Sequence, residues 1–230
     1  MDIIKKLFTW LILPIAIIAL VYAIVNSIMQ PVNFNKEKAY REDIAIQRLK
    51  DIRTLQVAFK SVNNRFAGTI DSLADFYNNG QMAVIMQVGS QDDSVAVAHT
   101  EAVKKANKKI TALDLYNMYM AGDKDLVFTV ENKIPVRDTL FNNRPDFNVD
   151  SLKYIPFSGG KEVEMTAISK LVSGVQVPLF EAKMAYRDLL KGLDNQLRIN
   201  LDADRKDQNK YEGLQVGSIT APNNNAGNWE

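Results

Sequence analysis

The first part of the chain is dominated by an uninterrupted run of apolar side chains. No charged residue occurs between Leu7 and Asn35, and the stretch from Leu7 to Met29 is predominantly apolar. A helix needs about 20 such residues to cross the roughly 30 Å hydrocarbon core of a bilayer. Trp10 and Tyr22 are amphipathic rings of the kind that anchor a span at membrane interfaces. We therefore predict one transmembrane helix over residues 7–29.

The lysines on either side of this run set the expected orientation. Lys5 and Lys6 directly precede it, which favours a cytoplasmic tail over residues 1–6 and an extracytoplasmic domain over residues 30–220. Lys36 and other basic residues beyond the run reduce this asymmetry. The alternative is a cleaved signal peptide, although the run is longer than a typical signal-peptide core and no Ala-x-Ala pattern ends it.

A second pattern follows a short connection at residues 31–35. Apolar side chains recur every three or four positions over residues 37–66, which predicts a long amphipathic helix that ends near Asn63, Asn64 and Gly68. We expect this stripe to pack on the domain's own core, with packing against partner subunits as the alternative. The stripe consists of Ala45, Leu49, Ile52, Leu55, Phe59, Val62 and Phe66.

The rest of the chain mixes short helices with strands. From Leu126 onward, β-rich runs separated by Asn, Gly and Pro predict a small, mostly antiparallel sheet. Residues 221–230 are polar and only Trp229 offers an apolar contact, so we expect a loose C-terminal tail. The predicted fold class is α+β: a transmembrane helix, a helical half, and then the sheet region. The other expected elements are helices at 70–77, 93–110 and 186–201 and strands at 82–88 and 214–219.

Charge and residue usage exclude several classes of function. The chain has 28 Lys and Arg against 27 Asp and Glu, so it lacks the basic excess of a dedicated nucleic-acid binder. It contains no cysteine, which excludes disulfides, thiolate metal sites and cysteine nucleophiles. The single histidine, His99, has no nucleophile-elbow motif to serve. We expect no catalytic residue and no cofactor, no small-molecule substrate, and a solvated helix face for the lysines at 104–109.

One short segment matches the oxygen-ligand spacing of a calcium loop. Asp146, Asn148 and Asp150 follow the pattern D-x-N-x-D, which would place three oxygen ligands on one side of a tight turn. An EF-hand is excluded because Ser151 and Phe157 occupy the positions that require Gly and Glu. The alternative is a hydrogen-bonded Asx turn without metal.

The segment Ala45–Leu73, AIQRLKDIRTLQVAFKSVNNRFAGTIDSL, resembles the second half of the long first helix of type IV pilins and type II secretion pseudopilins. In those families an apolar membrane half precedes an amphipathic half and a turn. Residues 6–9 lack the small residue of a prepilin cleavage site, and Pro31 is expected to interrupt the helix, so the resemblance implies a pilin-related fold kept as a fixed anchor. The matching positions are Ile52, Leu55, Phe59 and Phe66.

The whole chain also resembles membrane-anchored envelope proteins of Bacteroidota, through its segments VDSLKYIPF and GSITAPNNNAGNWE. This resemblance implies a bacterial inner membrane location and a periplasmic domain. It also implies O-glycosylation at Asp-Ser/Thr-apolar tripeptides, each of which would otherwise be an ordinary cap or turn. The candidate glycosylation residues are Ser72, Ser94, Thr139 and Ser151.

Two functions from different classes are consistent with these features. The first is a non-enzymatic, single-pass inner-membrane protein whose periplasmic domain contacts other envelope proteins, or copies of itself, in a secretion, pilus-like or other envelope assembly. The second is a membrane-anchored ligand-binding module or carboxylate-based hydrolase that uses the β-rich region from Leu126 to Ala182. A deep pocket with converging carboxylates would favour the second.

Overall fold

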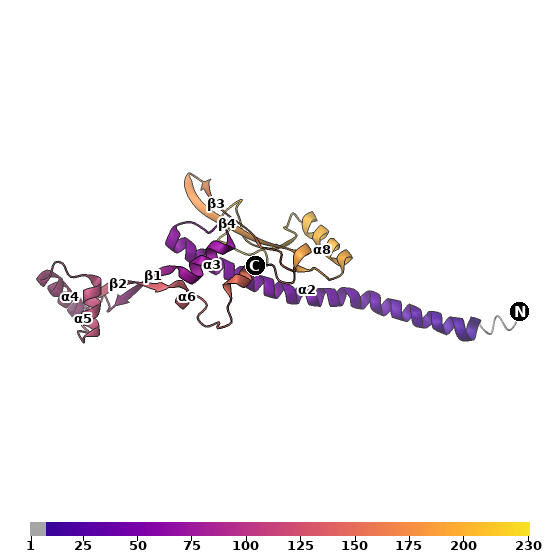
Figure 1. Ribbon diagram of the computed structural model, residues 1–230, viewed down its shortest axis with the longest axis horizontal. Coiled ribbons are helices and arrows are strands. Elements are labelled where there is room, and N and C mark those ends of the chain that lie inside the picture. Colours follow the sequence, from indigo (N-terminus) through magenta and orange to yellow (C-terminus); the bar gives the residue numbers. More distant parts are fainter. Residues whose placement is uncertain (1–7) are drawn as a thin grey trace.

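One helix runs from the start of the described chain into the folded domain. The computed structural model describes residues 8–230, so the expected cytoplasmic tail at 1–6 lies outside the described residues. A short π-helical segment, Phe8–Ile12, leads directly into α2, Leu13–Asn63. At about 1.5 Å per residue, the 51 residues of α2 span about 75 Å. Its N-terminal half extends away from the rest of the molecule (Figure 1).

The expected interruption of the helix at residues 31–35 is wrong. Pro31 lies inside α2, and the helix continues through it. A proline removes one backbone hydrogen bond, but it does not by itself end a helix when the segments before and after it both favour helix formation. Phe34 supplies a tertiary reason, because its side chain is buried in the main hydrophobic core and packs this part of the helix against the domain.

The second half of α2 packs against a three-stranded antiparallel sheet. The sheet has the order β3-β4-β5, with β3 at Glu164–Val172, β4 at Val175–Ala185 and β5 at Gly213–Gly217. The predicted apolar stripe is confirmed as the helix side of this core from Ala45 to Phe59, whereas Val62 is exposed and Phe66 is buried beyond the end of the helix. The sheet contributes residues of β4 and β5. Members of the core with almost no exposed surface include Leu49, Ile52, Leu55, Phe180, Met184 and Val216.

Short elements close the remaining sides of this core. The helix α3, Ile70–Asn79, begins where Thr69 accepts a hydrogen bond from the Ser72 amide. The expected helix at 186–201 is divided into α7, Tyr186–Leu189, and α8, Asn195–Asp207, because Gly192 between them adopts a positive φ of 85°. Two further short helices, α6 and η2, span Val136–Thr139 and Val149–Lys153, and α6 replaces part of one of the β-rich runs expected after Leu126.

A separate arm projects from the domain at the end opposite the N-terminal helix (Figure 1). Its stalk is a two-stranded antiparallel ribbon of β1, Gln81–Val88, and β2, Phe128–Pro135. Its tip carries α4, Ser94–Ala106, and α5, Ala112–Met120. The tip has a small core of its own, formed by Val88, Leu115, Leu126, Phe128 and Val130.

The α+β fold class is therefore confirmed, with an apolar N-terminal helix followed by mixed helices and small antiparallel sheets. The C-terminal residues differ from the expected loose tail. Trp229 packs against the main core, Gly227 forms a β-bridge with Val216, and the Asn228 amide donates to the Gln215 carbonyl at 2.9 Å. A polar segment docks here because its backbone pairs with the free edge of β5.

A buried ion pair ties the loop before η2 to α2. Asp51 is only 4% exposed, and Arg144 donates to its two carboxylate oxygens at 2.6 and 3.0 Å. The guanidinium also lies over the rings of Phe141 and Phe147, 5.4 and 5.2 Å from their centroids. The two rings stack with centroids 4.0 Å apart. The pair thus fixes an otherwise irregular loop on the helix.

We expect Arg144→Ala to destabilise the protein by about 2 kcal/mol, because it leaves the Asp51 carboxylate buried without its cation. This figure is below the usual cost of breaking a fully buried pair because the Arg144 side chain is 40% exposed. Thermal melts in detergent micelles would measure the change. Lys105→Ala, which removes an ion pair that is exposed on both sides, is the matched control and should leave the melting temperature unchanged. Equal melting temperatures for the two variants would contradict the role of the pair.

Candidate functional site

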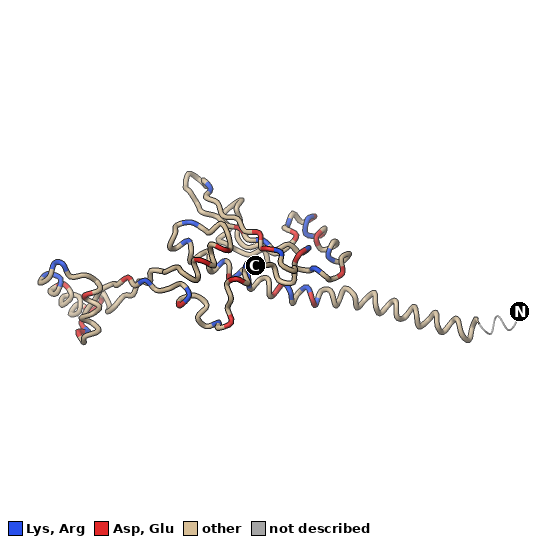
Figure 2. The backbone as a smooth tube through the Cα atoms, viewed as in Figure 1, with Lys and Arg blue, Asp and Glu red and all other residues tan. Residues whose placement is uncertain are grey.

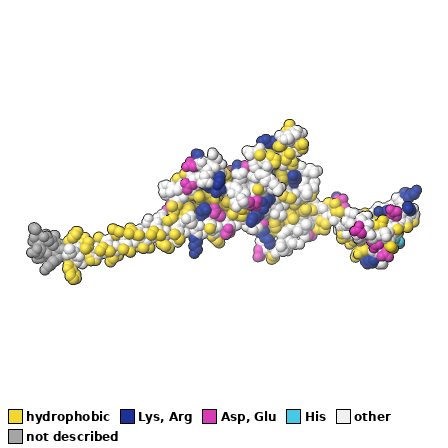
Figure 3. Space-filling view, turned by 180° about the vertical axis from the view of Figure 1, so that it is seen from behind, with side chains coloured by type: hydrophobic (Ala, Val, Ile, Leu, Met, Phe, Trp, Pro, Cys, Tyr) yellow, Lys and Arg dark blue, Asp and Glu magenta, His cyan; other side chains and the backbone are white. Residues whose placement is uncertain are grey.

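The N-terminal half of α2 has the surface of a membrane-embedded segment. The helix from Phe8 onward is long and apolar enough to cross a membrane, and its most apolar window is not buried by the protein. The first charged residue after Phe8 is Lys36, so this half appears free of charge in Figure 2 and as a continuous apolar rod in Figure 3. By length and composition it fits a membrane anchor or a signal sequence.

The domain contacts the helix directly beyond this apolar half. Gln30 donates a hydrogen bond to the carboxylate of Asp194, which also caps α8 through the Leu197 amide at 2.9 Å. Arg41, about three turns further along α2, donates to the carbonyls of Leu189 and Lys191 at 3.1 and 2.9 Å. These contacts border an open groove of about 850 Å³. The loop between α7 and α8 is thereby fixed at the level where the helix would leave a bilayer.

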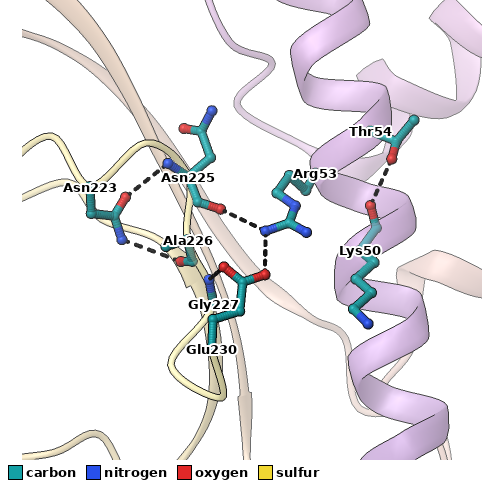
Figure 4. A network of polar contacts seen from close by, with 8 residues as sticks. All are labelled: Lys50, Arg53, Thr54, Asn223, Asn225, Ala226, Gly227 and Glu230. Carbon is teal, nitrogen blue, oxygen red and sulfur yellow. Dashed lines mark hydrogen bonds and ion pairs between the residues drawn. The ribbon is translucent and has the colours of Figure 1, made fainter.

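A polar network connects the second half of α2 to the C-terminal segment (Figure 4). Arg53 donates to the Glu230 carboxylate at 2.7 Å and to the Asn225 carbonyl at 3.4 Å. The second oxygen of Glu230 accepts from the Gly227 amide at 3.3 Å. The hydrogen bond from Arg53 holds the pKa of Glu230 below its usual value. An open groove of about 720 Å³ lies beside this network, between α2, Met82 and the C-terminal segment.

The calcium candidates lie in an exposed loop that leads into η2. Asp146, Asn148 and Asp150 are all exposed. Asn148 uses its side-chain oxygen to accept from the Asp150 amide at 2.9 Å, which is the Asx turn named above as the alternative. Within residues 8–230 no group of three or more His, Cys, Asp or Glu side chains is arranged to hold a metal ion. Calcium binding by this segment stays an expectation.

The four glycosylation candidates occupy helix starts and turns. Ser72 and Ser94 are exposed in the first turns of α3 and α4, whereas Thr139 and Ser151 are half-buried. The Thr139 hydroxyl donates to the Pro135 carbonyl at 3.2 Å, and the Ser151 hydroxyl donates to the Asn148 carbonyl at 2.7 Å. Accessibility therefore favours Ser72 and Ser94 as acceptors, and glycosylation itself stays an expectation.

His99 takes part in an exposed pair at the tip of the arm. Its Nε2 lies 2.9 Å from a carboxylate oxygen of Asp123, which joins α4 to the loop after α5. This hydrogen bond raises the pKa of His99 above its ordinary value, and the charges of Asp123 and Asp125 add to the effect. The pair holds together the two halves of the tip.

The arm is the feature that the residue pattern alone does not indicate. The strand at 82–88 is predicted correctly, but its partner is β2, some 40 residues further along the chain. The ribbon and tip thus place apolar side chains far from the core in solvent-exposed positions. These exposed side chains include Ile85, Val95, Leu113 and Met120.

The fold and these surfaces define an α+β protein with an N-terminal helix able to anchor it in a membrane. Comparison with known proteins adds no narrower class, because no family model, no curated protein and no solved structure matches the chain.

We expect Glu230→Gln to release the C-terminal segment at neutral pH. In the wild type, the depressed pKa of Glu230 contributes stability above its ordinary value of 4.5, and this contribution is lost as the pH falls through the folded-state pKa. With Trp10→Phe as background, Trp229 becomes the sole tryptophan. Its emission should shift to the red in acid for the background protein and already at neutral pH for the variant. Identical emission at neutral pH would contradict the role of the Arg53 pair.

The single histidine allows a second pH measurement. We expect its NMR titration to give a pKa above 6.5, and Asp123→Asn to lower it towards that value. Because the folded-state pKa is raised, the pair stabilises the tip fully below pH 6.5, and the contribution disappears as the pH rises through the folded-state pKa. Asp125→Asn, which removes only a charge at longer range, should lower the pKa less. An unchanged titration in Asp123→Asn would contradict the pairing.

Proposed function

We propose that this chain is a non-enzymatic, single-pass protein of a bacterial inner membrane, with a cytoplasmic N-terminus and a periplasmic domain that acts as a structural or interaction component of a secretion, pilus-like or other envelope assembly. The observation that carries this proposal is the continuity of α2. Its exposed apolar half and its core-forming half are one helix, so the domain is joined to the anchor without a flexible linker.

The arrangement of the domain on this helix supports a structural role. The contacts of Gln30 and Arg41 with the loop between α7 and α8 fix the domain's orientation on α2 directly beyond its exposed apolar half. In the proposed topology this is the level of the bilayer surface. The arm extends from the end of the molecule opposite the apolar half of α2 (Figure 1). In the proposed topology this direction is away from the membrane. A rigid anchor at one end and a projecting arm at the other suit a protein that bridges components of an envelope assembly.

The packing of an antiparallel sheet on the second half of a long helix supports the pilin-like form of this proposal. Buried carboxylates support a non-enzymatic role, since they are engaged in ion pairs. Asp51 pairs with Arg144, and Glu181 pairs with Lys183 and accepts from Gln215 at 3.0 Å. A hydrolase built on the β-rich region would need free carboxylates that face a shared cleft. Glu164, Asp202 and Glu212 line one small pocket, in which Asp202 is paired with Arg198.

Cysteine labelling in intact cells tests the topology. We expect Lys108→Cys, at an exposed position of the arm, to react with a membrane-impermeant thiol reagent admitted to the periplasm. Asp2→Cys should react only after the inner membrane is permeabilised. The cysteine-free parent is the matched background.

The reverse labelling pattern would place the domain in the cytoplasm and overturn the proposal. Loss of the Asp2→Cys residue from the mature chain would show a cleaved signal peptide. Mild detergent extraction then tests the assembly role. Elution as a monomer without other envelope proteins would contradict it.

A further inference from the structure

The two outer edges of the arm's ribbon differ in chemistry. The Val136 amide donates to the Gly80 carbonyl at 3.0 Å, which fixes Gly80 and Val136 as a hydrogen-bonded pair. Antiparallel ladders alternate such pairs with non-hydrogen-bonded pairs, whose backbone groups point outward. With the observed register, the outward residues of β1 are Gln81, Ala83, Ile85 and Gln87, and those of β2 are Thr129, Glu131, Lys133 and Pro135.

The β2 edge carries the features by which proteins prevent strand addition. Pro135 has no outward donor, and Glu131 and Lys133 place charges along the edge. Strand β1, by contrast, has the sequence QMAVIMQV, with no charged residue and no proline. Its outward residues are all exposed, and Ile85 is 70% exposed. In the described chain no strand other than β2 pairs with β1.

We propose that the free edge of β1 is a docking site for an extended, uncharged and predominantly apolar segment of another envelope protein, which adds to the ribbon as a third strand. The inference rests on the proposed function for the partner's compartment. Two-stranded ribbons are marginally stable in isolation, and a third strand with an apolar face stabilises them. The lack of charge on β1 favours a neutral segment, because a charged one would lose hydration without gaining a counter-charge.

A second copy of this chain fits the edge poorly. Copies anchored in one membrane would hold their β1 strands in the same direction, because the ribbon and α2 both follow the long axis (Figure 1). If a twofold axis along the membrane normal related two copies, each β1 residue would lie at the same height as the same residue of the other copy. A parallel ladder instead needs each outward residue to lie between two outward residues of its neighbour. The geometry therefore favours a different protein as the occupant.

A binding measurement on the full chain in detergent micelles tests this inference. The probe is a fluorescein-labelled peptide of alternating Thr and Val residues, as long as β1. We expect saturable binding, and Ile85→Pro should weaken it by about tenfold by removing one outward donor from the edge. Glu131→Pro is the matched control, because Glu131 lies directly opposite Ile85 in the ribbon and its donor points to the other edge. It should leave the affinity unchanged.

Further variants keep the test decisive. Ile85→Lys retains the backbone donor and places a charge on the edge, so it should also weaken binding if Ile85→Pro disturbs the fold. No saturable binding to the wild type, or equal loss in Glu131→Pro, would overturn the inference. Gln87→Cys tests whether a second copy of this chain occupies the edge, and Thr129→Cys, directly opposite in the ribbon, is its control. Disulfide-linked dimers of Gln87→Cys alone would show that the occupant is a second copy, which would overturn the inference. Because these assays need no cell envelope, peptide binding can hold even if the topology experiment fails.

Discussion

The packing of the apolar stripe of α2 against the sheet is the contact on which the rest of the molecule depends. It buries one face of a helix whose residues 13–30 are all exposed, and so makes the apolar segment and the domain a single body. Gln56 sits inside this contact with no exposed surface and exchanges two hydrogen bonds with the Ala67 backbone, at 2.8 and 2.9 Å. A buried amide is tolerated only where both of its groups are paired, so Gln56 also fixes how the chain turns back after the helix.

The three- and four-residue spacing of apolar side chains was sufficient to predict the face of α2 that forms this contact. The spacing of Leu49, Ile52, Leu55 and Phe59 identifies the buried face, because a helix with these residues on one side has to cover them. The same reasoning fails at Phe34, since a single aromatic residue after a proline gives no periodic signal. Its burial depends on a core whose members extend along the chain from Ala45 to Val216. Continuity of the helix was therefore a tertiary effect that local pattern could not predict.

The C-terminal segment and the arm were missed for a related reason. Residues 223–228 lack apolar residues except Ala226, and their order comes from backbone pairing with β5 and from Arg53, neither of which composition reports. For the candidate sites, the spacing of Asp146, Asn148 and Asp150 left a calcium loop and an Asx turn as alternatives, because spacing does not distinguish a ligand from a cap. The strand β1 was predicted, whereas its free edge was not, because the outward positions follow only from the register with β2.

The arm explains why an uncharged edge is tolerated in this protein. Edges of this kind promote aggregation when they meet freely in solution, and most sheets protect them. Here the apolar N-terminal helix would hold every copy in a membrane. The domain that bears the ribbon is packed on the second half of α2, so it cannot reorient independently of that helix. Copies held in this way would present their β1 edges in the same direction, which disfavours strand pairing between two copies of this chain. In the proposed topology, anchoring and rigidity would thus give β1 the protection that charge gives β2, and would leave β1 available to a strand of another protein.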